Sequence, residues 1–401
     1  MKFKRYITIA AMVILFGMIS LVTNLAAPLG IIIREQFHVS AALGLLGNFV
    51  SFAAYAVMGI PTGMLIGRIG YKKTAVAATG VGFAGLVLQY LSGCVGSFVV
   101  YLAGAFVAGF SLCMLNTVVN PMLNFLGGGG NRGNQLIQLG GSCNSLVGII
   151  VPMMVGALIG EVTKDTAIAD VNIVLYIAMA IFLVVGVTLA LIDVEEPAYW
   201  REAAAVSPWK FPHFVLGAIG IFIYCGVEIG IPATMNFYLV DRGLPAVQAG
   251  TFAGAFYIFM LAGRLSGIPL AARFSSRAML SAAALAGCVL IALAALWPED
   301  VGQVKGIPVN VYFLVLTGLC CSVMWGTIFN LAVEGLGKSV GMASGIFMTM
   351  VCGGGLLPFL QNVLSARVGY LASYWMIFAC LAYLAYYALA GSRQKKKLSV
   401  I

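Results

Sequence analysis

Glu228, Arg264 and Glu334 lie inside long apolar runs of the 401-residue sequence, where a charged side chain is costly and therefore informative. Glu228 falls near the middle of its run, in Tyr-Cys-Gly-Val-Glu-Ile-Gly-Ile-Pro, whereas Arg264 and Glu334 fall nearer the ends of theirs. A carboxyl group in a low-dielectric environment can exchange a proton near physiological pH. Glu228 is therefore predicted to carry a proton or to accept a polar substrate, with a structural bond to a neighbouring helix as the alternative. Arg264 and Glu334 are predicted to pair with each other.

Neutral amide side chains supply much of the remaining polarity in these runs. The predicted substrate contacts among them are Asn24, Asn116, Asn120, Asn144 and Asn330. An amide donates and accepts hydrogen bonds, as a sugar hydroxyl does, and Asn116 and Asn120, four residues apart, share one helix face. Amides between membrane helices also serve as packing contacts, and this alternative stays open for each of them.

Aromatic side chains offer a second way to hold a sugar. Trp325, Tyr90 and Tyr257 lie in apolar runs, where a ring either packs in the core or stacks on the apolar face of a pyranose. Trp325 is the aromatic residue that we predict to contact substrate.

These side chains must be positioned by membrane helices. Hydrophobic residues make up 62% of the chain and charged residues only 9%, which excludes a water-soluble fold. Apolar runs of about twenty residues, long enough to cross a hydrocarbon core as helices, recur along the whole chain. Twelve spans are predicted, at 6–33, 41–66, 74–92, 97–125, 135–160, 172–192, 213–240, 248–270, 278–297, 311–335, 342–365 and 372–391.

The basic residues orient the predicted spans. With a cytoplasmic N-terminus, sixteen of the 22 Lys and Arg residues face the cytoplasm, five face outward, and Arg264 stays inside a span. This bias follows the positive-inside rule, so a multi-pass inner-membrane protein with both termini in the cytoplasm is predicted. The net charge of +9 is then explained by topology and by contact with the lipid bilayer, and no nucleic acid partner is expected.

The spans divide into two halves at the polar segment 193–212. Thr117 and Asn120 in the fourth span recur as Thr327 and Asn330 in the tenth, both shifted by 210 residues. Matches in the same direction indicate a parallel duplication, which is found among transporters. The predicted domains are an N-terminal six-helix bundle (1–192), a cytoplasmic linker (193–212) and a C-terminal six-helix bundle (213–401).

The loop after the second span, from Gly63 to Lys73, resembles the signature loop of the major facilitator superfamily. Its glycines and basic residues are present, but Gly67 takes the place of the acidic residue that precedes Arg68. Arg68 is predicted either to contribute to a gating contact or only to hold the loop in the cytoplasm. The acidic side of any such gate must come from other groups.

Over most of its length the chain resembles the fucose/galactose/glucose:proton symporter family of that superfamily, the L-fucose permease group. The most specific matching segments are Asn116-Thr-Val-Val-Asn-Pro121, Asn144-Ser-Leu-Val-Gly, Gly226-Val-Glu-Ile, Gly263-Arg264-Leu-Ser-Gly, Thr327-Ile-Phe and Gly353-Gly-Gly. The resemblance implies the all-α major facilitator fold, with twelve transmembrane helices in two six-helix bundles. It also implies a sugar site at the bundle interface, reached by alternating access and driven by a proton gradient.

The resemblance also shows which coupling groups differ. The fucose permease aspartate of span one falls on Ala27, the span-four glutamate on Asn116 and a span-five glutamine on Gly141. The segment Gly226-Val-Glu228 resembles the glucose/galactose branch instead, which makes Glu228 the coupling candidate. A cation-coupled site or a passive one stays open.

The sequence thus predicts a secondary active transporter of a small polar solute, with a monosaccharide as the first candidate. No cofactor is expected beyond a proton gradient or a sodium gradient, and the chain is expected to be a monomer. An exporter of drugs or metabolites and an uncoupled facilitator are the alternatives. An enzyme or a channel is not expected, because the two histidines lie at span edges and no paired catalytic groups, nucleotide loop or selectivity filter stands in the sequence.

Overall fold

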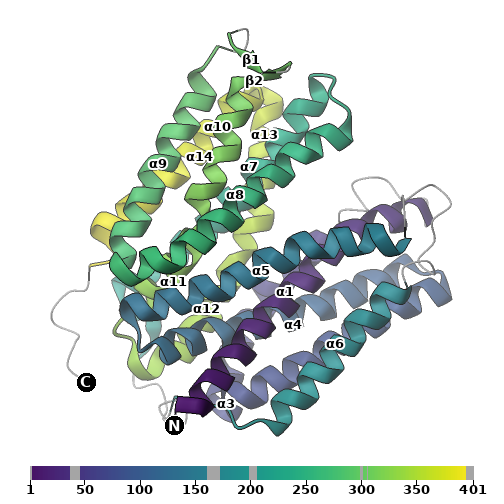
Figure 1. The fold of residues 1–401 in the computed structure, drawn as a ribbon, viewed down its shortest axis with the longest axis vertical. Coiled ribbons are helices and arrows are strands. Elements are labelled where there is room, and N and C mark those ends of the chain that lie inside the picture. The colour runs from purple at the N-terminus through teal and green to yellow at the C-terminus, as the bar shows by residue number, and fades with distance from the viewer. Residues whose placement is uncertain are drawn as a thin grey trace. The chain divides into compact units, whose positions relative to one another are not determined.

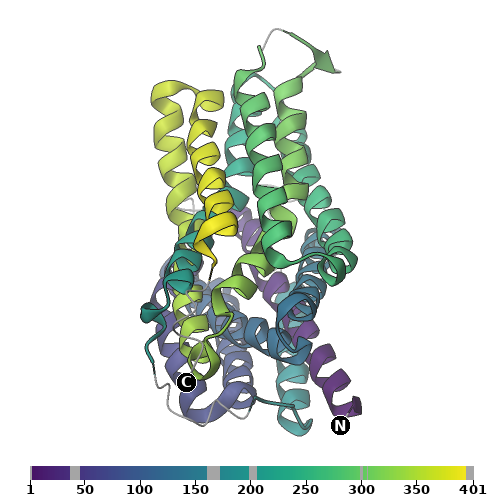
Figure 2. The same cartoon turned by 90° about the vertical axis from the view of Figure 1, so that its left-hand side faces the viewer.

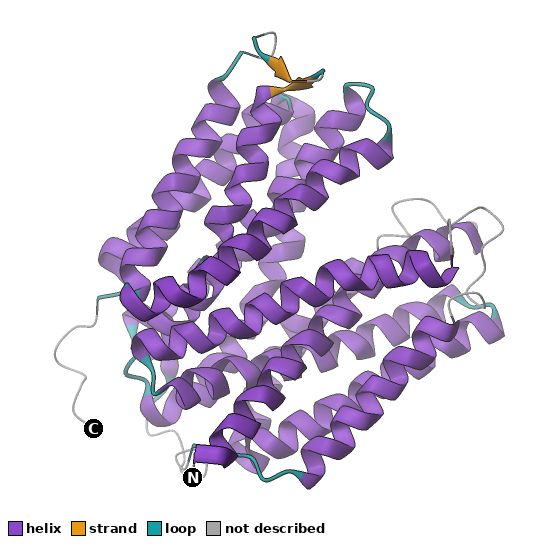
Figure 3. Cartoon of the chain, in the orientation of Figure 1, coloured by secondary structure: helices purple, strands orange, loops and turns teal. Residues whose placement is uncertain are grey.

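A computed structural model describes residues 2–36, 46–159, 172–197, 206–298, 301–304 and 306–393. Almost all of them are helical, as Figure 3 shows. The helices up to the polar segment are α1 (Lys2–Gln36), α3 (Leu46–Val95), α4 (Phe98–Gly127), α5 (Gly130–Ile159) and α6 (Asn172–Leu191). The later helices are a 3-10 turn (Pro208–Lys210), α7 (Pro212–Asp241), α8 (Ala246–Arg273), α9 (Ser276–Leu296), α10 (Val309–Ser322), α11 (Met324–Val333), a 3-10 turn (Gly337–Ser339), α12 (Val340–Thr349), a 3-10 turn (Met350–Cys352), α13 (Gly353–Val368), α14 (Tyr370–Tyr386) and a final π turn (Tyr387–Gly391). A short hairpin of β1 (Gln303–Val304) and β2 (Ile307–Pro308) stands between α9 and α10.

The helix lengths agree with a protein that crosses a membrane many times. Ten helical segments of the described residues are long and apolar enough to span a bilayer. One of them, Val50–Val95, is 46 residues long and contains Gly70 with φ 88° and ψ 173°, so it consists of two helices joined at this glycine. The 30-residue α5 adds a further helix. The arrangement is consistent with the twelve predicted spans.

The described residues form two compact units. The first unit comprises residues 1–126, 143–205 and 338–349, and the second comprises 127–142, 206–337 and 350–401. The first part of α5 therefore packs with helices from the C-terminal part of the sequence, and α12 packs with helices from the N-terminal part. Residues 198–205 of the predicted linker lie outside the described residues.

Close helix contacts hold the first unit together. α3 packs against α6 and α12, and α4 is buried continuously from Ser111 to Leu123. At the contact between α3 and α12, a Cβ added to Gly345 would lie 2.5 Å from the carbonyl oxygen of Gly59. Small residues let helix backbones approach in this way, which favours packing in a membrane.

α7 is the central helix of the second unit. It packs against α8, α10, α11, α13 and α14 (Figure 1), and α13 and α14 run side by side (Figure 2). A Cβ on Gly353 would lie 2.1 Å from the carbonyl oxygen of Phe222, and one on Gly226 would lie 2.3 Å from a side-chain carbon of Leu357. The glycines at Gly353 and Gly226 thus allow α13 and α7 to approach closely.

The tenth span is broken, although its apolar run predicted one continuous helix. α10 ends at Ser322 and α11 begins at Met324, with Val323 at φ −95° and ψ −8° between them. The carbonyl of Val323 accepts hydrogen bonds from the Thr327 hydroxyl at 2.8 Å and from the Gln138 amide of α5 at 3.1 Å. The same carbonyl also accepts the helical bond from the Thr327 backbone nitrogen at 3.3 Å, and side-chain donors at a helix carbonyl favour such an irregularity.

Gly353→Ala is expected to destabilise the protein by about 1–3 kcal/mol, because the added methyl group would press backbone against backbone. The matched control is Gly254→Ala in α8, where no atom lies within 4 Å of the added Cβ. This control is expected to be neutral or slightly stabilising, since alanine favours helix over glycine. Thermal unfolding of the purified protein in detergent compares the two, and equal midpoints for Gly353→Ala and the unmodified protein would contradict the close contact.

Candidate functional site

An ion pair lies inside the second unit. Arg264 Nη2 of α8 lies 3.3 Å from Glu228 Oε1 of α7, and the two side chains are only 10% and 18% exposed. Because burying one charge alone is far more costly than burying a bonded pair, each group compensates the charge of the other. The predicted pairing of Arg264 with Glu334 is wrong: Glu334 is exposed at the end of α11.

The other arm of Arg264 reaches a third helix. Its Nη1 donates a hydrogen bond of 3.1 Å to the carbonyl oxygen of Gly141 in α5. The absence of a side chain at Gly141 leaves room for the arginine, whose Cδ lies 3.6 Å from the place of a Cβ. The planar guanidinium group can serve several acceptors at once. Arg264 thus joins α7, α8 and α5.

Aromatic rings surround the pair. Tyr224 lies one turn before Glu228 on α7, is fully buried, and has its hydroxyl within range of the Glu228 carboxylate. Its ring meets that of Trp325 edge to face, with centroids 6.3 Å apart. Tyr257 lies seven residues before Arg264 on α8 and is close enough to interact electrostatically with the pair. Sequence reasoning missed Tyr224, although its spacing of four from Glu228 places both on one helix face.

The break in the tenth span lies next to the ion pair and its aromatic rings. Cys321 stands just before the break, within electrostatic range of Glu228 and Arg264, and Trp325 stands just after it. Gln138 of α5 bonds to the carbonyl at the break, and a Cβ on Gly326 would lie 3.0 Å from its amide nitrogen. Interrupted membrane helices commonly build binding sites, because they expose backbone groups within the bilayer.

The four predicted amides of the first unit form hydrogen bonds within it. Asn116 donates to the Tyr55 hydroxyl at 2.7 Å, and Asn120 donates to the Asn116 carbonyl at 2.9 Å. Asn24 donates to the Ser20 carbonyl at 2.9 Å, and Asn144 donates to the Phe16 carbonyl at 3.1 Å. Their contact with substrate stays a prediction.

The remaining predicted residues have the following contacts and exposure. Asn330 is buried and donates to the Ser276 hydroxyl at 2.8 Å, which ties α11 to α9. Arg68 is exposed on α3. The backbone carbonyl of Glu334 bonds to the His213 ring at 2.9 Å. The side chain of Ala27 lies outside the described residues.

The net charge of the Glu228–Arg264 pair can change when Glu228 gains or loses a proton. A proton on Glu228 would change the net charge of the pair from zero to plus one, and removal of the proton would restore neutrality. Within the described ranges, no group of three or more His, Cys, Asp or Glu residues could hold a metal ion. A charge pair enclosed by membrane-crossing helices is typical of a polytopic transporter.

The sequence matches the Major Facilitator Superfamily over residues 9–359, and the chain belongs to that superfamily. Its members named below are transporters and not enzymes, in agreement with the prediction from sequence.

The named relatives match most of the length of the chain. It is 28% identical over 403 residues to the glucose/galactose transporter of Brucella abortus biovar 1 (strain 9-941), which covers 97% of this chain and 95% of that protein. It is 21% identical over 351 residues to the L-fucose-proton symporter of Escherichia coli (strain K12), which covers 79% of this chain and 77% of that one. A crystal structure of the E. coli fucose:proton symporter superimposes with a TM-score of 0.85 at 20% identity, over 98% of this chain and 100% of that chain. The fold is therefore that of the major facilitators.

Proposed function

We propose that the chain is a secondary active transporter that moves a monosaccharide across the inner membrane by alternating access, with Glu228 as the proton-coupling residue. The relatives named above are a glucose/galactose transporter and a fucose symporter, so hexoses and deoxyhexoses are the first substrates to test. The observation that carries the proposal is the Glu228–Arg264 pair, a titratable carboxylate held inside the second unit.

Coupling follows from the two bonds of Arg264. Protonation of Glu228 removes the counter-charge of a guanidinium group that is 10% exposed and still bonded to the Gly141 carbonyl. A buried, uncompensated cation is unfavourable, so protonation favours any conformation in which Arg264 gains water or a new acceptor. The proton on Glu228 thereby acts on α5 as well as on α7 and α8. A sodium gradient is the alternative driving force.

Aromatic and amide side chains provide the chemistry for holding the sugar. Trp325 offers a half-buried ring beside the ion pair, and stacking on such a ring favours the apolar face of a pyranose. Asn24, Asn116, Asn120, Asn144 and Asn330 are the proposed partners of sugar hydroxyls, which can take over hydrogen bonds that the amides now make to protein groups.

The topology belongs to the same proposal. We infer two six-helix bundles, 1–192 and 213–401, joined by a cytoplasmic linker at 193–212, in a chain that is a monomer in the lipid bilayer with both termini in the cytoplasm. The positive-inside bias of the basic residues supports this orientation.

Uptake of radiolabelled sugars into vesicles that contain the purified protein tests the function. Glucose, galactose, fucose and a disaccharide are each measured with an imposed pH gradient, with a sodium gradient, and with neither. Accumulation of a hexose or deoxyhexose above its equilibrium level under the pH gradient is expected. Absence of uptake of any sugar, together with stabilisation by lipophilic cations in a thermal-shift assay, would identify an exporter instead.

A further inference from the structure

A cavity opens in the second unit, away from the ion pair. It has a volume of about 540 Å³ and lies where the ends of α7 and α9 meet the turn between α13 and α14. Asp241, at its wall, follows Glu228 by thirteen residues on α7, which corresponds to about 20 Å along a helix. The volume falls within the range of roughly 300–1,000 Å³ that is typical of small-molecule sites. We call this space the outer cavity.

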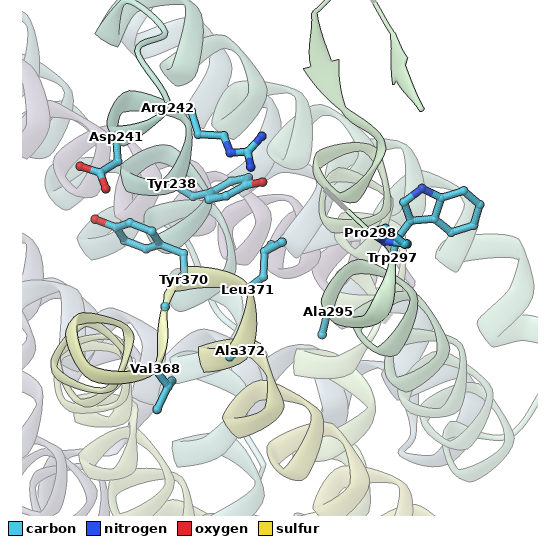
Figure 4. A pocket seen from close by; sticks show the side chains of 11 residues that line it. Tyr238, Asp241, Arg242, Ala295, Trp297, Pro298, Val368, Tyr370, Leu371 and Ala372 are labelled. Atoms are coloured by element: carbon cyan, nitrogen blue, oxygen red, sulfur yellow. The ribbon is translucent and has the colours of Figure 1, made fainter. Parts of the chain in front are cut away.

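Aromatic rings and two side chains of opposite charge line one wall of the outer cavity. The guanidinium carbon of Arg242 lies 5.2 Å from the centre of the Tyr238 ring, and the rings of Tyr238 and Tyr370 meet at 6.2 Å, edge to face. Figure 4 shows the Arg242 side chain over the Tyr238 ring, with Asp241 and Tyr370 beside them. Trp297 and Pro298 line the cavity from the end of α9.

The backbone determines where the residues of this wall lie. Gly369, at φ 89°, both ends α13 and begins α14, so the connection between the two helices is a single residue. A side chain at this φ would be strained. The Tyr238 carbonyl accepts a bond from the backbone nitrogen of Arg242, which caps α7 and fixes the spacing of the two residues. The backbone that carries Tyr238, Arg242 and Tyr370 is therefore fixed before any ligand arrives, which lowers the entropy cost of binding.

The composition selects a neutral, hydroxyl-rich ligand. An anion would meet the Asp241 carboxylate, and a cation would meet the Arg242 guanidinium, whereas a neutral polyol can donate to the first and accept from the second. The phenol rings suit the apolar face of a sugar ring.

We propose that the outer cavity is a second, weaker binding site for a monosaccharide, on the face predicted to be outside the cell, where it holds substrate before transport. The proposal rests on the proposed function, because it takes the transported sugar as the ligand. It adds a site separate from the ion pair, with Asp241, Arg242, Tyr238 and Tyr370 as its binding residues.

Two tryptophans allow the two sites to be observed separately. The chain has five tryptophans, so one variant retains only Trp297, at the outer cavity, and another retains only Trp325, beside the ion pair; the others become Phe. Each is titrated with glucose, galactose and fucose in turn, whether or not the vesicle assay shows their uptake. We expect a saturable change in Trp297 fluorescence at millimolar sugar, and a tighter response from Trp325.

Substitutions in the outer cavity test whether its side chains bind the sugar. Asp241→Asn removes the charge of one acceptor and Tyr370→Phe removes one hydroxyl; added to the Trp297 variant, each is expected to weaken its response by roughly tenfold. Tyr312→Phe is the matched control, because the Tyr312 hydroxyl bonds to the Val304 carbonyl outside the cavity; it should leave the response unchanged. A response from Trp325 without one from Trp297 would overturn the outer site and leave the transport proposal intact, whereas silence from both, with no uptake, would remove the proposed function itself.

Uptake kinetics give a second measure that does not depend on fluorescence. In the chain with all tryptophans present, Asp241→Asn is expected to raise KM severalfold and to leave kcat unchanged, because the ion pair and its surroundings are untouched. An unchanged KM in Asp241→Asn and Tyr370→Phe, with normal protein levels, would overturn the outer site.

Discussion

Arg264→Met is expected to lower the free energy of unfolding by about 3–5 kcal/mol and to abolish uptake, because it leaves the carboxylate of Glu228 buried without its partner. The exposures of 10% and 18% place both side chains largely out of water. The variant also loses the bond from Arg264 to the Gly141 carbonyl, so α5 loses a contact with α8. Equilibrium unfolding in mixed micelles with increasing SDS measures the change in free energy.

The double variant Glu228→Gln with Arg264→Met separates the charge from the packing. A neutral pair of similar volume carries no uncompensated charge, so most of the lost stability is expected to return while coupled transport stays absent. The matched control is Arg68→Met, since Arg68 is exposed and substitutions at exposed sites stay within about 0.5 kcal/mol. If Arg264→Met were as stable as Arg68→Met, the ion pair would not be formed in the folded protein.

The position of Glu228 within its apolar run could be predicted, but the partner of Arg264 could not. Hydropathy gives the depth of a residue along a span, and Glu334 and Arg264 lie at similar depths, which predicts that they pair. The partner depends on the direction in which each side chain leaves its helix and on which helices are neighbours. α8 packs directly against α7, and this contact brings Glu228 to Arg264.

Some of the groups around the ion pair could be predicted from the sequence, and others could not. The spacing of four between Tyr224 and Glu228 predicts a shared face, so Tyr224 could have been identified. The Gly141 carbonyl could not, because any backbone carbonyl in an apolar helix looks the same in sequence. The break at Val323 was also hidden, and the Gln138 amide that bonds to its carbonyl lies almost two hundred residues earlier in the chain.

Glu228→Gln is expected to eliminate accumulation of substrate against its gradient while exchange of labelled for unlabelled substrate continues. Glutamine keeps the size of the side chain and an oxygen that can accept a bond from Arg264, but it cannot exchange a proton at physiological pH. Substrate binding and the conformational change thus persist without the driving force. Counterflow and pH-driven uptake, measured in the same vesicles, distinguish the two activities.

Glu334→Gln is the matched control for this prediction, because it removes the other carboxylate first identified in the apolar runs, one that the structure places exposed at the end of α11. Accumulation is expected to survive there. Accumulation that persisted in Glu228→Gln as well would show that the proton is carried elsewhere, and the Glu228–Arg264 pair would then serve only to join α7, α8 and α5. Loss of both exchange and accumulation in Glu228→Gln would instead show that the carboxylate is needed for binding substrate. The coupling role therefore depends on the one outcome in which exchange remains and accumulation is lost.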